Sequence, residues 1–449
     1  MNVLLKEYFH YIYEMRFFFT APPPMASWLL SFMLSGLLLG QTAAPKLEQS
    51  IDTAMQLAIQ AKAFPGAQLL VAYRGEVLIE KAYGFHTYDS LVPVRSSDLY
   101  DLASVTKVMG PLPALMKLVA EGVLDLDAPF SRYWKPWRRY KDKKDLTLRE
   151  ILAHQAGLTP YIVFLNELLS PANKGLKKRF VRAQSSKRFG LKAYENRFVR
   201  SRFPRKMYRQ INRSEVSQDK KYRYSGLAFL LFPELISQLT GQPYLSYMRS
   251  QFYDPLGAHS LGYLPKERNA SFSMVPTEFD SLFRKGLTQN YVHDENAALF
   301  GGVSGNAGLF SNARDLSKML QMFSNGGVYG GRQYLAVETL AAFTKTQYPE
   351  NSNRRGLGFD KPLLGNDSLA ASKAYPAPAV SPASFGHSGF TGTFVWVDPT
   401  HDLIYVFLSN RVYPSRTQDG IYTTNVRELV QQLIYEGLGL TDSSKESFF

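Results

Sequence analysis

Apolar runs mark β-strands near both ends of the chain. Residues 67–73 (AQLLVAY) and 76–83 (EVLIEKAY) flank Arg74-Gly75, and two apolar runs around a short Gly-containing connection are typical of a β-hairpin. Towards the other end, residues 393–397 (TFVWV) and 403–408 (LIYVFL) flank a turn rich in Asp, Pro and His. The pattern therefore predicts strands at both ends of the chain.

Apolar residues at helical spacing predict a helix outside each pair of strands. The residues that predict these two helices are Leu47, Ile51, Met55, Ala58 and Ile59 at the first end, and Val426, Leu429, Val430, Leu433 and Ile434 at the second.

The long middle of the chain also has a mostly helical pattern. Thr147 and Glu150 form a capping box that opens a short helix. Residues 225–240 are strongly apolar and end at Gly241, a typical C-cap, and we expect Pro233 to kink this helix. A further helix is predicted by Leu316, Met319, Leu320 and Phe323, and it ends at Gly326-Gly327.

If the terminal strands share one sheet, the middle must be a helical insertion between them. We therefore predict an α+β fold, with one antiparallel sheet built from both chain ends, flanked by helices, and a mostly helical inserted domain. The predicted boundaries are a leader at 1–44, one domain at 45–440 (sheet subdomain 45–100 and 385–437, helical subdomain 105–384) and a tail at 441–449. Residues 351–384, rich in Asn, Ser, Ala and Pro, are predicted to form a loop.

The N-terminus has the features of an export signal. Trp28–Gly40 is an uncharged apolar run, and the small residues Thr42-Ala43-Ala44 follow it where a signal peptidase would cleave. The run is shorter than the roughly 20 residues that span a bilayer as a helix. We expect a periplasmic or secreted protein, and an uncleaved membrane anchor is the alternative.

Composition excludes several classes of protein. Apolar residues make up 45% of the 449 residues and aromatic residues 14%, which suits a large folded core and not a disordered chain. The chain has no cysteine, so disulfides, thiolate nucleophiles and Cys-bound zinc are excluded.

The positive charge is concentrated in one segment. Residues 161–223 contain 18 of the 52 Lys and Arg but only 4 of the 38 Asp and Glu, which accounts for the whole net charge of +14. We expect a solvated, basic, helical insertion, and the alternative is a site for an anionic envelope polymer or a membrane surface. Nucleic acid is not expected, because zinc-finger spacing and RNA-binding aromatic motifs are missing.

Ser104 and Lys107 form the first candidate for chemistry. A Lys three residues after a Ser lies on the same helical face, and a neutral amine there can take the hydroxyl proton and make the Ser a nucleophile. A Ser at a helix start also lies at the positive end of the helix dipole. The alternative is an N-cap Ser with a surface Lys, and a second match, Ser217–Lys220, lies in the basic segment.

Two more motifs follow in order along the chain. Tyr224-Ser225-Gly226 opens an apolar helix, and a Tyr beside an ammonium can act as an acid or base, although a lone Tyr is more often a core residue. Gly386-His387-Ser388-Gly389 leads into a strand whose edge can pair with a substrate. The backbone N–H groups of Phe390 and Ser104 would then form an oxyanion hole. The alternative for this stretch is an ordinary glycine-rich turn.

The other titratable residues suggest no metal site. His86, His154, His259, His293 and His401 have no metal-binding spacing. His154 is expected to pack or cap, and Asp294-Glu295 to start a helix or lie in a loop. No G-x-S-x-G motif occurs, which argues against an α/β-hydrolase nucleophile elbow.

The ordered set of three motifs resembles the β-lactamase and penicillin-binding-protein superfamily, on its class C-like side. Further similar stretches are LTLREILAHQAGL (146–158), YDPLGAHSLGY (253–263), VHDENAALFGGVSGNAGLFS (292–311) and FGHSGFTGTFVWVDP (385–399). The combination is most similar to the serine hydrolase modules of Bacteroidetes-type bacteria, some of them fused to family-3 glycoside hydrolases.

The resemblance implies a serine hydrolase that works through an acyl-enzyme. Ser104 would attack an acyl carbonyl while Lys107 and Tyr224 share proton transfer. His387 would take the place of the family's third-motif Lys, and Ser388 and Gly389 would line the edge strand. The implied substrates are cell-wall D-alanyl peptides, β-lactams or small esters, and we expect a monomer without metal or cofactor.

One departure from the family keeps a second hypothesis open. The family has Asn or Asp at the third position of the Tyr motif, where this chain has Gly226. The missing side chain would touch the Lys and the substrate amide. Together with the basic segment, this motivates the alternative of a catalytically degenerate module that binds the cell envelope.

Overall fold

The computed structural model describes residues 45–170, 175–268 and 271–441. The chain divides into two compact units, Met1–Ser50 and Ile51–Phe449. In the first unit the described residues 45–50 are helical, and the predicted leader at 1–44 lies outside the described residues, as does nearly all of the predicted tail. Within the described ranges, no helix is both long and apolar enough to cross a membrane.

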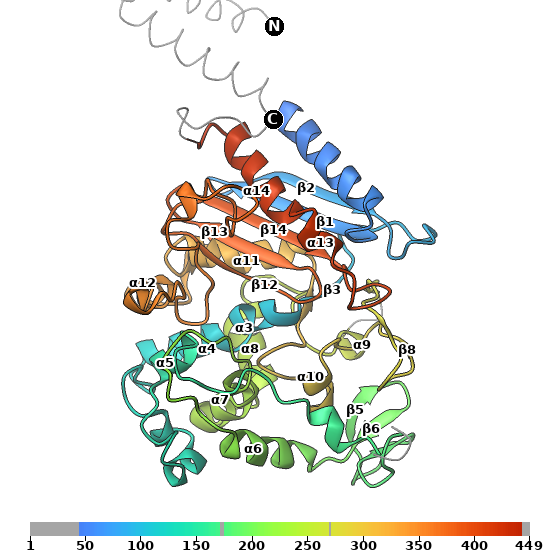
Figure 1. Cartoon of the computed structure of the whole chain (residues 1–449), viewed down its shortest axis with the longest axis vertical. Helices are drawn as coiled ribbons and strands as arrows, with labels where there is room; N and C mark the ends of the chain where they lie inside the picture. Colours follow the sequence, from blue (N-terminus) through green and yellow to red (C-terminus); the bar gives the residue numbers. More distant parts are fainter. Residues whose placement is uncertain (1–44, 171–174, 269–270, 442–449) are drawn as a thin grey trace, which may run out of the picture. The chain divides into compact units, whose positions relative to one another are not determined.

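The second unit contains a five-stranded antiparallel sheet built from both ends of the chain (Figure 1). Its strands are β1 (Gly66–Tyr73), β2 (Glu76–Gly84), β12 (Phe385–Ser388), β13 (Phe394–Asp398) and β14 (Leu403–Ser409), in the order β12-β13-β14-β1-β2. Strand β1 pairs with β14 over seven residues, from Ala67 opposite Ser409 to Tyr73 opposite Leu403. Every residue of β14 is buried. The predicted sheet from both chain ends is confirmed.

Helices cover both faces of this sheet (Figure 1). Residues 51–60 are helical and lie beside α14 (Val426–Gly437) on one face, while α11 (Ala313–Ser324) packs on the other. Asp52 accepts hydrogen bonds from Lys81 and Tyr83 of β2. The sheet is therefore buried from both sides, which explains why its central strands are continuously apolar.

The regular secondary structure between β2 and β12 is mostly helical, as predicted. Its main helices are α4 (Pro111–Ala120), α5 (Leu148–Leu152), α6 (Phe203–Arg213), α7 (Phe232–Thr240), α8 (Tyr244–Met248), α10 (Glu295–Leu299) and α12 (Val337–Thr344). Helix α5 begins with the predicted capping box between Thr147 and Glu150.

Two predictions in this region are wrong in detail. The apolar stretch from Ser225 becomes α-helical only at Phe232, so Pro233 lies in the first turn of α7 and does not kink it. A missing N–H is harmless there because the first N–H groups of a helix have no intrahelical partner. Gly241 does end this helix, in the left-handed conformation with φ +70°.

The basic segment is also not purely helical. It contains α6 and a small antiparallel sheet with the order β4-β6-β5, formed by β4 (Val181–Arg182), β5 (Leu191–Tyr194) and β6 (Arg197–Val199). Val181, Ala193 and Val199 are buried within these strands. Their neighbours are largely basic or aromatic, and such short alternating runs give no helical period.

Candidate active site

Ser104 and Lys107 lie one turn apart, as the sequence predicts. Ser104 is in a 3₁₀ turn (Ala103–Val105) that continues into α3 (Thr106–Met109). The Nζ of Lys107 donates hydrogen bonds to Ser104 Oγ at 2.9 Å and to the carbonyl of Asn306 at 3.1 Å. The lysine is 2% exposed. Its amine is therefore held against the hydroxyl and away from bulk water.

The helix that follows Ser104 is interrupted soon after the site, as Pro111 and Pro113 in the apolar run predict. It breaks at Gly110, and a separate helix, α4, begins at Pro111. Only the four residues Thr106–Met109 are α-helical before this break, so few aligned peptide dipoles add up at the positive end beside Ser104. The other Ser-x-x-Lys match is not comparable, because Lys220 pairs with Glu150 at 3.1 Å.

The backbone before Ser104 is held in a strained conformation. Ala103 has φ +45°, in the left-handed region, which costs a non-glycine residue roughly 1–2 kcal/mol. The Ala103 N–H donates to Asp101 Oδ1 at 2.8 Å, and the carbonyls of Asp101 and Leu102 accept from the hydroxyls of Thr391 and Thr393 at 2.7 and 3.0 Å. The turn between β12 and β13 thus fixes the nucleophile's backbone.

Gly389 allows this close approach. A Cβ at Gly389 would lie 2.1 Å from Thr393 Oγ1 and 2.5 Å from the Leu102 carbonyl oxygen. The Gly389 N–H donates to the Thr393 carbonyl at 2.7 Å, which closes the turn. The next residue, Phe390, is anchored through its carbonyl by Arg411 Nε at 2.8 Å. The predicted oxyanion donors therefore belong to two turns that touch each other.

The ring of Tyr224 lies among three titratable side chains. The ring centre is 5.3 Å from Lys107 Nζ, and the ring centres of His154 and His387 lie 4.5 and 6.2 Å from it. Among the described residues, no hydrogen bond joins the Tyr224 phenol to Ser104. The three motifs converge, but only Lys107 contacts the hydroxyl directly.

His387 occupies the third-motif position but carries no charge there. Its Nδ1 lies 2.7 Å from the carbonyl oxygen of Ser388, and its Nε2 lies 3.4 Å from Arg355 Nη2. Burial, and then the charge of Arg355, lower the pKa of His387 to about 3. His387 therefore does not replace a lysine electrostatically at neutral pH.

Two hollows meet at Ser104, Tyr224 and Phe390. The larger, of about 770 Å³, is also lined by Gly226, and the smaller, of about 340 Å³, by His387, Ser388 and Gly389. A Cβ at Gly226 would meet nothing closer than Asn306 Cβ at 4.0 Å. The departure from the family pattern thus leaves open space beside the lysine.

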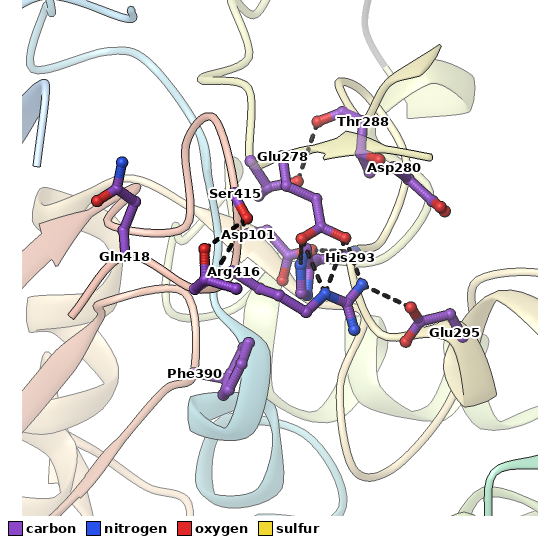
Figure 2. A network of polar contacts seen from close by, with 12 residues as sticks. Asp101, Glu278, Asp280, Thr288, His293, Glu295, Phe390, Ser415, Arg416 and Gln418 are labelled. Atoms are coloured by element: carbon purple, nitrogen blue, oxygen red, sulfur yellow. Dashed lines mark hydrogen bonds and ion pairs between the residues drawn. The ribbon is translucent and has the colours of Figure 1, made fainter. Parts of the chain in front are cut away.

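A charged network forms one wall of the larger hollow (Figure 2). Arg416 binds both Glu278 and Glu295, with Nη2 2.6 Å from Glu295 Oε1. His293 lies 3.3 Å from Glu278 Oε2 and donates its backbone N–H to Asp101 Oδ2 at 2.6 Å. Burial raises the pKa of Glu278, but His293 and Arg416 outweigh it and lower the pKa to about 2.

The acidic pair of this wall has the predicted structural role. Asp294 is the N-cap of α10 and its Oδ1 accepts the Ala297 N–H at 2.7 Å. His154 also packs as expected, buried against Tyr224 with Nδ1 accepting the Ser225 N–H at 3.2 Å. Among the described residues, no group of three or more His, Asp or Glu side chains is arranged to hold a metal ion.

Sequence reasoning missed Arg355 and Asn306. Arg355 lies in the predicted loop 351–384 and lines the smaller hollow beside Tyr224. Asn306 supplies the carbonyl that accepts from Lys107. Asn306 lies in a stretch quoted for the family resemblance, whereas Arg355 has no motif around it that would mark it.

Comparisons with known proteins show the family of this chain. The model of the Beta-lactamase family matches residues 47–429. The chain belongs to the Beta-lactamase family. A relative from Escherichia coli O157:H7, named as a D-alanyl-D-alanine carboxypeptidase, is 30% identical over 382 residues, which are 78% of this chain and 79% of that protein. This Beta-lactamase-family protein is therefore a serine hydrolase.

Solved structures show the same fold. EstCE1, a hydrolase with promiscuous acyltransferase activity, aligns with a TM-score of 0.61 and 19% identity over 87% of this chain and 99% of its own. A class C β-lactamase from Rhodobacter sphaeroides aligns with a TM-score of 0.58 and 17% identity over 86% and 99%. The predicted likeness to Bacteroidetes-type modules stays a prediction.

Proposed function

We propose that this Beta-lactamase-family protein acts through an acyl-enzyme at Ser104, on the amide or ester of a D-alanyl peptide, a β-lactam or a small ester. The observation that carries the proposal is the 2.9 Å contact between Lys107 Nζ and Ser104 Oγ, at the junction of two open hollows. A nucleophile and its base must lie within hydrogen-bonding reach. A buried lysine in a purely structural role would not need to face substrate-sized space.

In the proposed acylation, the unprotonated amine of Lys107 takes the Ser104 proton as Oγ attacks the acyl carbonyl. The N–H groups of Ser104 and Phe390 bind the developing oxyanion, and each such donor typically contributes 10²–10³ in rate. The phenol of Tyr224 gives a proton to the leaving group. Water then attacks the acyl-enzyme, with proton transfer in the reverse direction.

The two hollows suit the two halves of a substrate. Tyr224, the proposed proton donor, lines both hollows, and we assign the leaving group to the smaller one, beside His387 and Ser388. The acyl group then occupies the larger hollow beside Gly226. With about 770 Å³ available, this side accommodates an acyl group of drug size or larger.

We favour an ester or peptide substrate over a dedicated role in β-lactam resistance. The name of the Escherichia coli relative supports a D-alanyl peptide. The lack of a carboxamide side chain at Gly226 removes one partner for a substrate amide, and a buried amide without partners costs binding energy. Ester substrates, which have no N–H to satisfy, are less affected.

The proposal is tested by covalent labelling. The protein is incubated with a tagged fluorophosphonate, a fluorescent penicillin and a panel of acyl donors, and Ser104-containing peptides are then weighed by mass spectrometry. We expect stoichiometric adducts at Ser104 that vanish in Ser104→Ala, and a kcat/KM for esters that is lowered roughly 10²–10⁴-fold in Lys107→Met. A well-folded sample without any adduct would favour the degenerate binding module.

The role of Gly226 is tested by restoring the family's side chain. Gly226→Asn places a carboxamide in open space, so we expect the fold to be retained. The ratio of amide to ester kcat/KM should rise at least about tenfold if one new hydrogen bond is made to the substrate amide. An unchanged ratio would exclude the missing carboxamide as the cause of substrate preference.

Export and envelope binding are further parts of the proposal. The apolar run Trp28–Gly40 and the small residues after it support export, which fractionation of cells and N-terminal sequencing of the mature protein would test. The basic segment 161–223 supports contact with an anionic envelope polymer. Retention on a polyanion column that weakens with rising salt would be its first test.

A further inference from the structure

The hydrogen bonds of His387 fix its protonation state. Nδ1 lies 2.7 Å from the Ser388 carbonyl oxygen, which can only accept, so Nδ1 carries the proton. Nε2 lies 3.4 Å from Arg355 Nη2, which can only donate, so Nε2 is the acceptor. An imidazole with this pair of partners is neutral. The positive charge that the resemblance assigns to the third motif is therefore not on His387.

A fixed positive charge lies directly behind His387. Arg355 is 2% exposed, and its Nη1 binds Asp360 Oδ1 at 2.8 Å while Nη2 donates to the Gly358 carbonyl at 3.2 Å. Its guanidinium carbon lies 5.6 Å from the centre of the Tyr224 ring. Arg355 also lines the smaller hollow together with Ser104 and Tyr224.

Asp360 prevents the guanidinium from moving away. Its carboxylate also pairs with Arg354 Nη2 at 2.8 Å and accepts the hydroxyl of Tyr375 at 2.9 Å. Its backbone N–H donates to the Gly386 carbonyl at 2.8 Å, and it accepts the Gly386 N–H in return. Arg355 is therefore tied through Asp360 to the strand that carries His387.

Arg354 provides a contrast within the same cluster. It pairs with the same carboxylate, but its guanidinium carbon lies over the ring of Tyr375 at 4.8 Å. Both arginines line the smaller hollow. Only Arg355 faces both His387 and Tyr224.

We propose that Arg355 is a positioning residue that supplies the fixed positive charge beside Tyr224 and keeps His387 neutral. A cation near a phenol favours its anionic form, which helps the proton to leave Tyr224 for the leaving group and to return later. The same cation disfavours a protonated imidazole at Nε2. The inference rests on the proposed acyl-enzyme function.

The test compares one substitution at the two arginines. Arg355→Gln removes the charge but keeps N–H donors for Gly358 and His387, and Arg354→Gln is the matched control. The readout is kcat/KM for an alkyl acetate, whose alkoxide leaving group needs the proton of Tyr224, from pH 4 to 10. We expect Arg355→Gln to lose roughly 10–100-fold at the plateau, with an acid limb that reaches to higher pH than the parent's, because the pKa of His387 rises when Arg355 no longer repels its proton.

Rescue and control variants separate the charge from packing. Arg355→Lys should recover at least about tenfold of the loss. Arg354→Gln, which lines the same hollow and pairs with the same carboxylate, should lose clearly less than Arg355→Gln and leave the shape of the pH profile unchanged. The inference would be overturned if the pH profiles of ester kcat/KM for Arg355→Gln and the parent coincided. It would also be overturned if Arg355→Gln and Arg354→Gln lost equal amounts of kcat/KM. A parent that is neither labelled at Ser104 nor active overturns the proposed function instead.

A measurement on the parent protein keeps the inference testable if Arg355→Gln does not fold. The ¹³Cε1 resonance of His387, assigned through His387→Asn, should show a neutral Nδ1–H ring down to about pH 4. An imidazole that titrates near its ordinary pKa would overturn the inference.

Discussion

At the scale of single residues, the two glycines of the site have different requirements. Gly389 is surrounded by backbone and by Thr393, so that a Cβ would lie 2.1 Å from the nearest atom. At Gly226 the nearest atom to a Cβ is 4.0 Å away. A sequence shows both as glycine in a motif, and only the space around each tells a steric requirement from a free position.

Replacing glycine by alanine should therefore be destabilising at Gly389 and tolerated at Gly226. Gly389→Ala forces the turn before β13 away from the Ser104 backbone, and we expect a loss of about 1–3 kcal/mol in the free energy of unfolding. The shift of the Phe390 N–H should lower ester kcat/KM roughly 10²-fold. Gly226→Ala is the control and should keep the stability within about 0.5 kcal/mol. Urea unfolding and ester kinetics check both, and similar values for the two variants would contradict the steric argument.

Residue types and their order predicted most of the site. Ser104, Lys107, Tyr224 and His387 come together from three distant motifs, because the chemistry limits which residue types can occupy these positions. The charge state of His387 was not predictable, since it depends on burial and on Arg355, a neighbour 32 positions away in sequence. How close the Tyr224 phenol lies to Ser104 was not predictable either, because it depends on side-chain placement that no motif fixes.

At the scale of elements, the turn between β12 and β13 clamps the nucleophile. Two hydroxyls from this turn bind the carbonyls of Asp101 and Leu102, next to Ala103 in its left-handed conformation. Strain of this kind persists only where the surroundings hold it in place. The sheet thus positions Ser104 through the turn that follows the Gly386–Gly389 motif.

Removing one hydroxyl of the clamp should affect turnover more than binding. Thr393→Val keeps the side-chain shape but leaves the Leu102 carbonyl without that partner, which costs about 1–3 kcal/mol. We expect kcat to fall at least about tenfold while KM changes little, because Ala103 relaxes and misplaces Ser104. Ser384→Ala removes a comparable buried bond, to the Ser381 carbonyl at 2.7 Å. This control should destabilise the protein without the fall in kcat, and an equal fall would refute the clamp.

Long apolar patterns in the sequence predicted helices and strands correctly, and short patterns did not. The strands at both chain ends, α11 and α14 have long periodic apolar faces, and these predictions are confirmed. The strands of the basic segment are two to four residues long, which is too short to show a period. The interruption of the helix after Ser104 was predictable, because Pro111 and Pro113 stand in its otherwise continuous apolar run, and the structure breaks the helix at Gly110.

At the scale of the whole molecule, Arg416 joins three distant segments. It lies just beyond β14 and binds Glu278 and Glu295, which are 138 and 121 positions away in sequence (Figure 2). Glu278 is 4% exposed. The lowered pKa of Glu278 means that its charged form is bound more tightly in the folded protein than in the unfolded chain.

This cluster should make the fold sensitive to acid. The pKa of Glu278 falls from its ordinary 4.5 to about 2, so its contribution is fully present above about pH 4.5 and is lost as the pH drops towards 2. We expect roughly 2 kcal/mol at neutral pH, discounted from the full shift because Arg416 remains partly exposed. Glu278→Gln should lose this stability at pH 7 and show a flatter acid dependence, measured by urea unfolding from pH 2 to 7. The exposed Glu350→Gln should match the parent, and an unchanged Glu278→Gln curve would contradict the prediction.

The outer edge of β12 has one further consequence for the size of the reaction partners. On an antiparallel edge strand only alternate residues turn their N–H and C=O groups outward, and within β12 those of Gly386 are already bonded to Asp360. Ser388 is the next outward position, and its carbonyl is shared with the His387 ring. An extended substrate chain lying along this strand could form backbone hydrogen bonds only at Ser388. Beyond that residue it would collide with the loop that contains Asp360. The proposed acyl-enzyme chemistry should therefore act at free termini and leave the interior bonds of a long polymer uncut.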